Sequence, residues 1–227
     1  MNKAYFLDIN ELKKEFSYEE IYNLVSSYRK DKVDKLKFEK DKWLSLGVEF
    51  LLMQELNKLK IDYSKVELDF RQNNKPYLKN CNQKLFFNLS HSEKMAMCTI
   101  ADNEVGCDIQ KISINKDFIT IADRFFHPRE IQVIRNAKEK EQIDLFYRIW
   151  VLKESYIKAT GEGFQTPLKD FQISLDNERP KVVVEGIIQN DFILEEKHVD
   201  NPNYKSAVCI KRAQGKNTQN NCLFWYR

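Results

Sequence analysis

The 227-residue sequence has no long apolar run and no regular arrangement of cysteines. No stretch approaches the roughly 20 apolar residues of a membrane-spanning helix. The apolar run at the start, Met1–Asp8, is too short for a signal peptide, because Asp8 interrupts it. The five cysteines have neither an even count nor metal-ligand spacing, which excludes a disulfide framework and a zinc site. Three in strand-like runs are expected to be buried free thiols of a cytoplasmic protein: Cys98, Cys107 and Cys209.

An excess of charge of one sign is also absent. The net charge is only +3, which gives little support to nucleic-acid binding. Seven Lys or Arg do gather between Arg29 and Lys42, but four acids are interleaved with them. Mixed signs are typical of a solvated helical face, although such a segment can also face a nucleotide or an acidic partner.

The apolar content of 42%, with 15 Phe and 10 Tyr, excludes disorder and supports one sizeable core or two small ones. Hydrophobic spacing predicts helices over 21–28, 39–59, 117–125, 128–137 and 141–160. Short strand-like runs are expected at 66–70, 85–89, 95–101, 104–110, 171–175, 182–188, 192–199, 205–211 and 222–226. Gly161 is a natural left-handed cap for the longest helix, and Asp102-Asn103 is a plausible tight turn.

Helices followed by strands therefore occur twice along the chain. Lys94–Cys98 and Lys205–Cys209 share the pattern Lys-x-Ala-x-Cys, each in a strand after a long helix. The echo suggests a duplication into two α+β halves, 1–103 and 104–227. Each half is expected to be a small, mostly antiparallel sheet on a long helix, with a cleft between the halves, where pockets are favoured.

The strand Val105–Gln110 combines a glycine with an acid, and both residue types disfavour strands. Alternation puts Gly106, Asp108 and Gln110 on one face. The glycine permits close approach by a ligand or by another backbone. The carboxylate and amide oxygens suit a hard cation such as Mg²⁺, while the alternative is an edge strand with a solvated polar face.

The long helix carries Glu154 and Lys158 one turn apart, with Trp150 one turn before them on the same face. The simplest interpretation of Glu154 and Lys158 is an exposed ion pair that contributes little. Upstream, Asn88, Ser90, His91 and Ser92 end a strand with short polar groups that suit a phosphate. Adjacent side chains on an extended chain point to opposite sides, so Ser90 and His91 do not predict a hydrolase.

Together these segments resemble the 4′-phosphopantetheinyl transferases, in particular the two-halved type exemplified by the surfactin-synthetase activator. The resemblance runs from about Arg29 to Lys211. The ordered pair of the Val105–Ile109 strand and the Trp150–Lys158 helix is its most specific part. The weaker matching segments are Lys75-Pro76, Phe87–Ser92, Arg124–Phe126, Phe146-Tyr147 and Tyr204–Val208.

The resemblance implies a pseudo-dimer of two α+β halves that binds its co-substrate, coenzyme A, across the cleft. Asp108 and Glu154 would hold Mg²⁺, with Gln110 as a further ligand, and Lys158 would contact the pyrophosphate. His91, Arg29 and Lys32 would bind the 3′-phosphate, and Lys75 and Pro76 would line the adenine pocket. The residues assigned to coenzyme A are Arg29, Lys32, Lys75, Pro76, Asn88, Ser90, His91 and Lys158.

The implied reaction transfers phosphopantetheine to a serine of an apo acyl or peptidyl carrier protein and releases adenosine 3′,5′-bisphosphate. Asp108, Glu154 and Lys158 are the expected catalytic residues. Glu154 is also the family's candidate base, but a carboxylate beside Mg²⁺ and Lys158 should have a lowered pKa. We therefore rank Glu154 first as a ligand and second as a base.

Two positions depart from the family pattern. Gln110 stands where many relatives have an acid, which predicts weaker Mg²⁺ affinity rather than inactivity. Trp43 stands near where relatives have an arginine that reaches the nucleotide, so that either Lys42 substitutes for it or Trp43 stacks on adenine.

The rival functions are a non-catalytic protein that binds carrier proteins or coenzyme A, and a nucleic-acid-binding module. An internally duplicated chain has less need of a partner, which favours a monomer.

Overall fold

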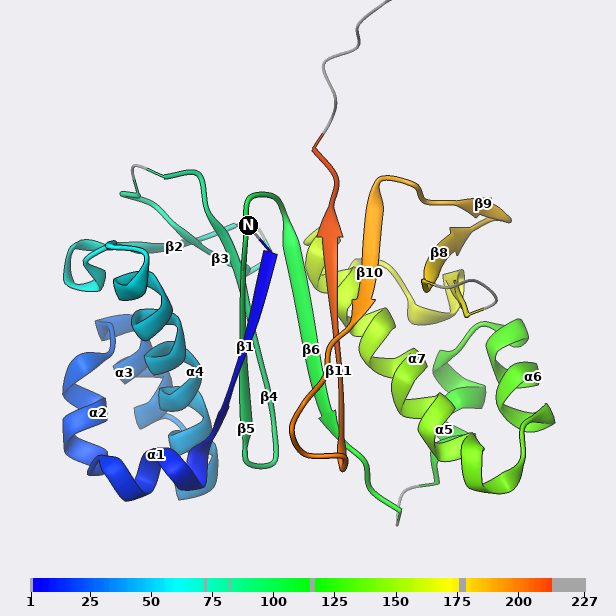
Figure 1. The fold of residues 1–227 in the computed structure, drawn as a ribbon, viewed down its shortest axis with the longest axis horizontal. Helices are drawn as coiled ribbons and strands as arrows, with labels where there is room; N and C mark the ends of the chain where they lie inside the picture. The colour runs from blue at the N-terminus through cyan, green and yellow to red at the C-terminus, as the bar shows by residue number, and fades with distance from the viewer. Residues whose placement is uncertain (1, 72, 82, 115–116, 176–178, 214–227) are drawn as a thin grey trace, which may run out of the picture.

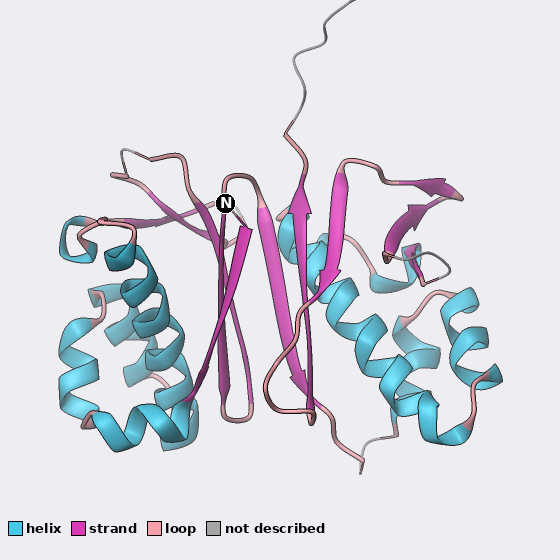
Figure 2. Ribbon diagram, in the orientation of Figure 1, coloured by secondary structure: helices cyan, strands magenta, loops and turns pink. Residues whose placement is uncertain are grey.

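The computed structural model describes residues 2–71, 73–81, 83–114, 117–175 and 179–213. Two three-stranded sheets lie in the middle of the molecule, and helices cover their outer sides (Figure 1, Figure 2). One apolar cluster fills the space between the two sheets, and other clusters join each sheet to its own helices. The layers are therefore helix, sheet, sheet and helix.

The N-terminal half begins with a strand and ends with a β-hairpin, and its sheet has the order β1-β5-β4 with antiparallel pairing. Its strands are β1 (Asn2–Asp8), β2 (Leu68–Phe70), β3 (Pro76–Leu78), β4 (Phe86–Ser92) and β5 (Met95–Ala101). Its helices are α1 (Ile9–Glu15), α2 (Tyr18–Leu24), α3 (Ser27–Asp34) and α4 (Glu39–Lys58). The short strands β2 and β3 form a separate hairpin.

The C-terminal half repeats this plan, and its sheet has the order β10-β11-β6. Its helices are α5 (Phe118–Phe125), α6 (Pro128–Asn136) and α7 (Glu139–Thr160). Its strands are β6 (Val105–Lys111), β7 (Phe171–Ser174), β8 (Lys181–Val184), β9 (Ile187–Ile188), β10 (Phe192–Glu196) and β11 (Tyr204–Lys211). Strands β7, β8 and β9 form a small additional sheet.

The two main sheets have the same topology. In each, the last strand of the hairpin lies in the centre, between its hairpin partner and the strand that opens the half. The two Lys-x-Ala-x-Cys segments occupy these central strands, β5 and β11, and their Ala and Cys side chains are fully buried. The predicted α+β architecture of two similar halves is confirmed, and so are the buried free thiols.

Two predicted elements are each divided in the structure. The expected helix over 21–28 is broken, because Ser17 caps the start of α2 and Ser26 caps the start of α3. The expected strand over 182–188 is split into β8 and β9 by a turn at Glu185-Gly186, both at positive φ. The predicted strand 222–226 lies outside the described residues.

The predicted turn at Asp102-Asn103 connects β5 and β6, but these strands do not form a hairpin. Instead β6 crosses to the second sheet and pairs with β11. The end of α7 is as predicted, with Gly161 at a φ of 75°. No helix within the described residues is long and apolar enough to span a bilayer.

Candidate active site

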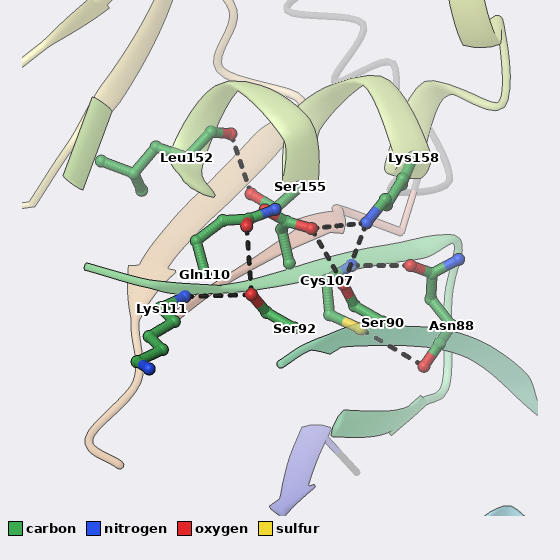
Figure 3. A network of polar contacts seen from close by, with 10 residues as sticks. Asn88, Ser90, Ser92, Cys107, Gln110, Lys111, Leu152, Ser155 and Lys158 are labelled. Carbon is green, nitrogen blue, oxygen red and sulfur yellow. Dashed lines mark hydrogen bonds and ion pairs between the residues drawn. The ribbon is translucent and has the colours of Figure 1, made fainter. Parts of the chain in front are cut away.

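The site lies where the edge strands β4 and β6 meet. Asn88 Oδ1 accepts a hydrogen bond from Cys107 N at 2.9 Å, and Ser90 Oγ donates to Asp108 Oδ1 at 2.9 Å (Figure 3). Further along, Ser92 Oγ lies 3.3 Å from Gln110 Oε1. Contacts from every second residue of β4 therefore hold β6, which explains why this strand end is rich in short polar side chains.

Asp108 and Lys158 form an ion pair in this junction. Asp108 is only 2% exposed, and its Oδ1 accepts from Lys158 Nζ at 2.6 Å. Lys158 Nζ also lies 3.2 Å from Ser90 Oγ, so that strands from both halves and helix α7 meet here. Burial is the largest single effect and would lower the pKa of Lys158, but the charge and hydrogen bond of Asp108, together with Cys107 and Glu154, outweigh it, and the pKa is raised. Lys158 is therefore a fixed cation.

The sequence alternatives of a solvated face at Asp108 and a surface ion pair at Glu154 are both wrong. Asp108 is buried, and Lys158 pairs with Asp108. The half-buried Glu154 makes no hydrogen bond or ion pair with another described residue. Burial raises the pKa of Glu154, Asp108 raises it further, and Lys158 partly opposes them. The pKa of Glu154 is therefore raised overall by the protein, whereas the sequence led us to expect a pKa lowered by Mg²⁺ and Lys158.

Gly106 permits the close approach of another backbone. A Cβ atom at this position would lie 2.1 Å from the Ser155 carbonyl oxygen and 2.3 Å from the Ala159 nitrogen. The absence of a side chain therefore lets the last turns of α7 lie directly on β6, which brings Lys158 over Asp108.

A cavity of about 680 Å³ opens beside Glu154 and Lys158. Its wall comes from α5, α7 and the segment 163–169, so all its lining residues belong to the C-terminal half. We expected a cleft between the halves; the polar groups do lie at that junction, but the large cavity does not. Trp150 forms part of the wall and packs on Phe126 and Phe146, with ring centroids 6.0 and 5.7 Å apart.

Positive charges surround His91 at the end of β4. The pKa of His91 is lowered, mainly because the surrounding protein displaces water, and further by the charges of Lys32, Lys158 and Arg29. Lys32 and His91 are exposed, whereas Arg29 is buried at 6% exposure. Cations from α3 and α7 thus converge on His91 at the end of β4, which favours an anion.

Arg29 does not lie on the solvated face that the mixed charges of its segment suggest. Its Nε donates to Glu49 Oε2 at 2.7 Å, and its Nη1 donates to Ser45 Oγ at 3.2 Å. Glu49 is fully buried, and Tyr63 Oη donates to its other oxygen at 2.7 Å. The guanidinium is therefore partly occupied by protein, and its binding of a phosphate stays a prediction.

Other assigned residues also have protein partners. Gln110 directs its amide nitrogen toward Asp108 Oδ2 at 3.4 Å, and its oxygen faces Ser92. Lys75 directs its ammonium into the C-terminal half, and Pro76 begins β3. Their roles as metal ligand and adenine contacts remain predictions.

Trp43 belongs to the core of the N-terminal half. It is 5% exposed, stacks edge-on with Tyr18, and donates to Glu39 Oε1 at 3.2 Å. Stacking of Trp43 on adenine is therefore not supported, because its ring is already covered.

The buried pair of Lys153 and Glu130, whose exposures are 0% and 1%, was not predicted from the sequence. Lys153 Nζ lies 2.9 Å from Glu130 Oε2 and also donates to the carbonyls of Leu168 and Phe171. The available signal was the placement of Lys153 beside the apolar stripe of α7. The ion pair ties α7 to α6, and the bond to the Leu168 carbonyl ties α7 to the segment that lines the cavity.

Family models match both halves of the chain. The model described as the 4′-phosphopantetheinyl transferase superfamily matches residues 104–209, and that described as 4′-phosphopantetheinyl transferase, N-terminal, matches residues 13–103. The chain belongs to the 4′-phosphopantetheinyl transferase superfamily.

Curated relatives carry the same description. The transferase HetI of a Nostoc strain is 33% identical over 54% of this chain, and the transferase gsp of Aneurinibacillus migulanus is 35% identical over 59%. The transferase Sfp of Bacillus subtilis is 28% identical over 84% of each protein. The match spans only about half the length of the first two relatives, 52% and 55%.

Proposed function

We propose that this chain catalyses Mg²⁺-dependent transfer of 4′-phosphopantetheine from coenzyme A to a serine of an apo acyl or peptidyl carrier protein. Adenosine 3′,5′-bisphosphate is the other product. The observation that carries this proposal is the convergence of Asp108, Glu154 and Lys158 beside the large cavity. Membership of the superfamily supports the reaction class. We also propose that the two halves meet between residues 103 and 104, and that one chain suffices for the site.

The donor set fits Mg²⁺. No group of three His, Cys, Asp or Glu side chains suited to a metal occurs in the described part of the chain. Mg²⁺, however, usually takes only one or two carboxylates, and water and phosphate supply the remaining oxygens. Asp108 raises the pKa of Glu154, a sign of repulsion between two carboxylates that a cation would relieve. Asp108 and Glu154 would hold the ion, and Gln110 would complete the set through its oxygen or through water.

The reaction forms one bond and breaks one. The serine oxygen attacks the phosphorus attached to pantetheine, and the bond from that phosphorus to the bridging pyrophosphate oxygen breaks. The bridging oxygen leaves with the nucleotide. Lys158 stabilises the negative charge that develops on this leaving phosphate, because its ammonium is held in place by Asp108 and Ser90. Bound Mg²⁺ would supply further positive charge to the pyrophosphate.

The serine proton needs an acceptor. Glu154 is the candidate, since it lines the cavity and has no protein hydrogen-bond partner among the described residues. A loose transition state places little demand on this base, because the proton leaves late. We therefore keep Glu154 as a ligand first and a base second.

The nucleotide end of coenzyme A needs a separate anion site. His91 and Lys32 are exposed; His91 lies within electrostatic reach of Lys158, Lys32 and Arg29, and Lys32 lies within reach of Arg29. We assign the 3′-phosphate to His91 and Lys32, with Arg29 contributing charge from beneath the surface. Ser90 and Asn88 hold β4 against β6 and thereby shape this region.

A mass assay tests the proposal. The protein is incubated with coenzyme A, Mg²⁺ and purified apo carrier proteins of the fatty-acid, polyketide and nonribosomal-peptide types. The expected result is the addition of one phosphopantetheine mass to at least one carrier. A folded protein that binds coenzyme A but adds no mass to any carrier would instead be a binding protein, and the enzyme proposal would be overturned.

A further inference from the structure

The turn between β2 and β3 reaches out of the N-terminal half and contacts the end of α7. Lys75 Nζ donates to the Lys158 carbonyl at 2.7 Å, to the Val105 carbonyl at 2.9 Å, and to Glu104 Oε2 at 3.2 Å. Asn73 Nδ2 donates to the Gly161 carbonyl at 2.6 Å. All four acceptors belong to the C-terminal half.

These contacts satisfy carbonyls that a helix end leaves without partners. The carbonyl of Ile157 accepts from Gly161 N at 3.1 Å, within the helix cap. The next amide, Glu162 N, bonds to Thr160 Oγ1 at 3.3 Å, so it does not continue the ladder to Lys158. Lys75 takes that place, and its positive charge suits the negative end of the helix dipole.

The Lys75 ammonium has three N–H donors, and three oxygens of the protein accept from them. Its side chain is only 10% exposed. The pKa of Lys75 is lowered, mainly because of burial, and the charge of Glu104 opposes part of this effect. Glu104 is itself held by Arg71 at 2.5 Å. The ammonium therefore has its hydrogen bonds within the protein and offers little to a nucleotide.

We propose that Asn73 and Lys75 form a helix cap supplied by the opposite half, which sets the position of Lys158 over Asp108. Both are then positioning residues for the transfer, an inference that rests on the proposed function. The position matters because Lys158 and Glu154 lie on the last two turns of α7, where Gly106 already allows contact with β6. The cap would hold these turns against lateral shift.

Hydrogen exchange measured by mass spectrometry tests the cap without any assay of activity. Peptides from 155–162 are compared between the wild type, Asn73→Ala and Lys75→Met. Lys79→Met is the matched control, since Lys79 follows the same hairpin, is 54% exposed, and approaches Glu67 and Asp69 only at 3.9 Å. Exchange near the end of α7 should rise about threefold to tenfold in the first two variants and stay unchanged in the third.

Unchanged exchange at the end of α7 in Asn73→Ala overturns the cap. This variant loses one exposed side chain and tests the proposal even if Lys75→Met fails to fold. The exchange result stands whether or not the chain is a transferase, so failure of the cap and failure of the proposed function are distinguishable.

Kinetics then separate positioning from nucleotide contact. For positioning, kcat should fall about threefold or more in Asn73→Ala and Lys75→Met, with KM for coenzyme A changed less than about twofold. Lys75→Arg should recover part of kcat, because it keeps a charged donor. A raised KM with unchanged kcat in Lys75→Met would make Lys75 a nucleotide contact and overturn its positioning role.

Discussion

Asp108 and Lys158 are 50 positions apart in the chain, and their side chains meet at 2.6 Å. The pair connects β6 to α7 at the junction where Ser90 approaches from the N-terminal half. A helix that slid along β6 would separate them. The ion pair is therefore a direct indicator of whether the two halves and α7 are correctly assembled.

Removal of either acid should abolish transfer. In Asp108→Ala or Glu154→Ala, we expect the rate of carrier modification to fall by a factor on the order of 100 or more, because the Mg²⁺ that would stabilise charge on the pyrophosphate loses a ligand. Asp123→Ala is a suitable control, since Asp123 forms a surface ion pair with Arg135. Near wild-type rates in either Asp108→Ala or Glu154→Ala would contradict the assignment.

Gln110→Glu should tighten Mg²⁺ binding. A third carboxylate adds one negative charge to the donor set, so the Mg²⁺ concentration at half-maximal activity should fall several-fold. The variant also replaces the amide nitrogen that faces Asp108. Gln189→Glu is the control, because Gln189 directly follows β9 and the variant changes the net charge by the same amount. Identical half-saturation in Gln110→Glu and wild type would count against a ligand role.

His91→Gln should weaken coenzyme A binding and flatten its pH dependence. The pKa of His91 is lowered in the protein, and a bound phosphate dianion favours its protonated form. Binding therefore takes up a proton, and affinity should increase as the pH falls from 8 toward about 6. Calorimetric titration at several pH values measures this, and equal slopes in wild type and variant would refute the role.

Gly106→Ala should destabilise the fold and disturb the site. The new Cβ would meet backbone atoms of α7 at 2.1 Å, and backbone cannot move aside cheaply. We expect the free energy of unfolding to fall by about 3 kcal/mol, measured by urea denaturation. Gly47→Ala is the matched control, because its 2.2 Å contact is the Ile9 Cδ1 methyl, which can rotate away. Equal losses in both variants would be inconsistent with this account.

Lys153→Met should cost more stability than removing both charges of the buried pair. The single variant leaves Glu130 buried beside fewer donors, which is expected to destabilise by about 3–5 kcal/mol. In Lys153→Met with Glu130→Gln, part of this loss should be recovered, because no unpaired charge remains. Thermal and urea unfolding of the three proteins gives the comparison. A double variant less stable than Lys153→Met would show that the ion pair is not the main contribution.

The sequence by itself determined the faces of the two central elements. A period of two puts Gly106, Asp108 and Gln110 on one side of β6, and a period near 3.6 puts Trp150, Glu154 and Lys158 on one side of α7. These periods are local properties of the backbone, so they required no knowledge of the fold. The duplicated order of helices and strands and the end of α7 at Gly161 were predictable for the same reason.

Only the tertiary structure decided which groups meet. Lys158 pairs with distant Asp108 instead of Glu154 one turn away, Arg29 is buried against Glu49, and Lys75 caps a helix of the other half. The position of the large cavity within the C-terminal half was likewise not visible from local patterns. Which charged side chains become partners depends on long-range packing and on the desolvation of charges. A local pattern states which side a group faces, but not what the fold places there.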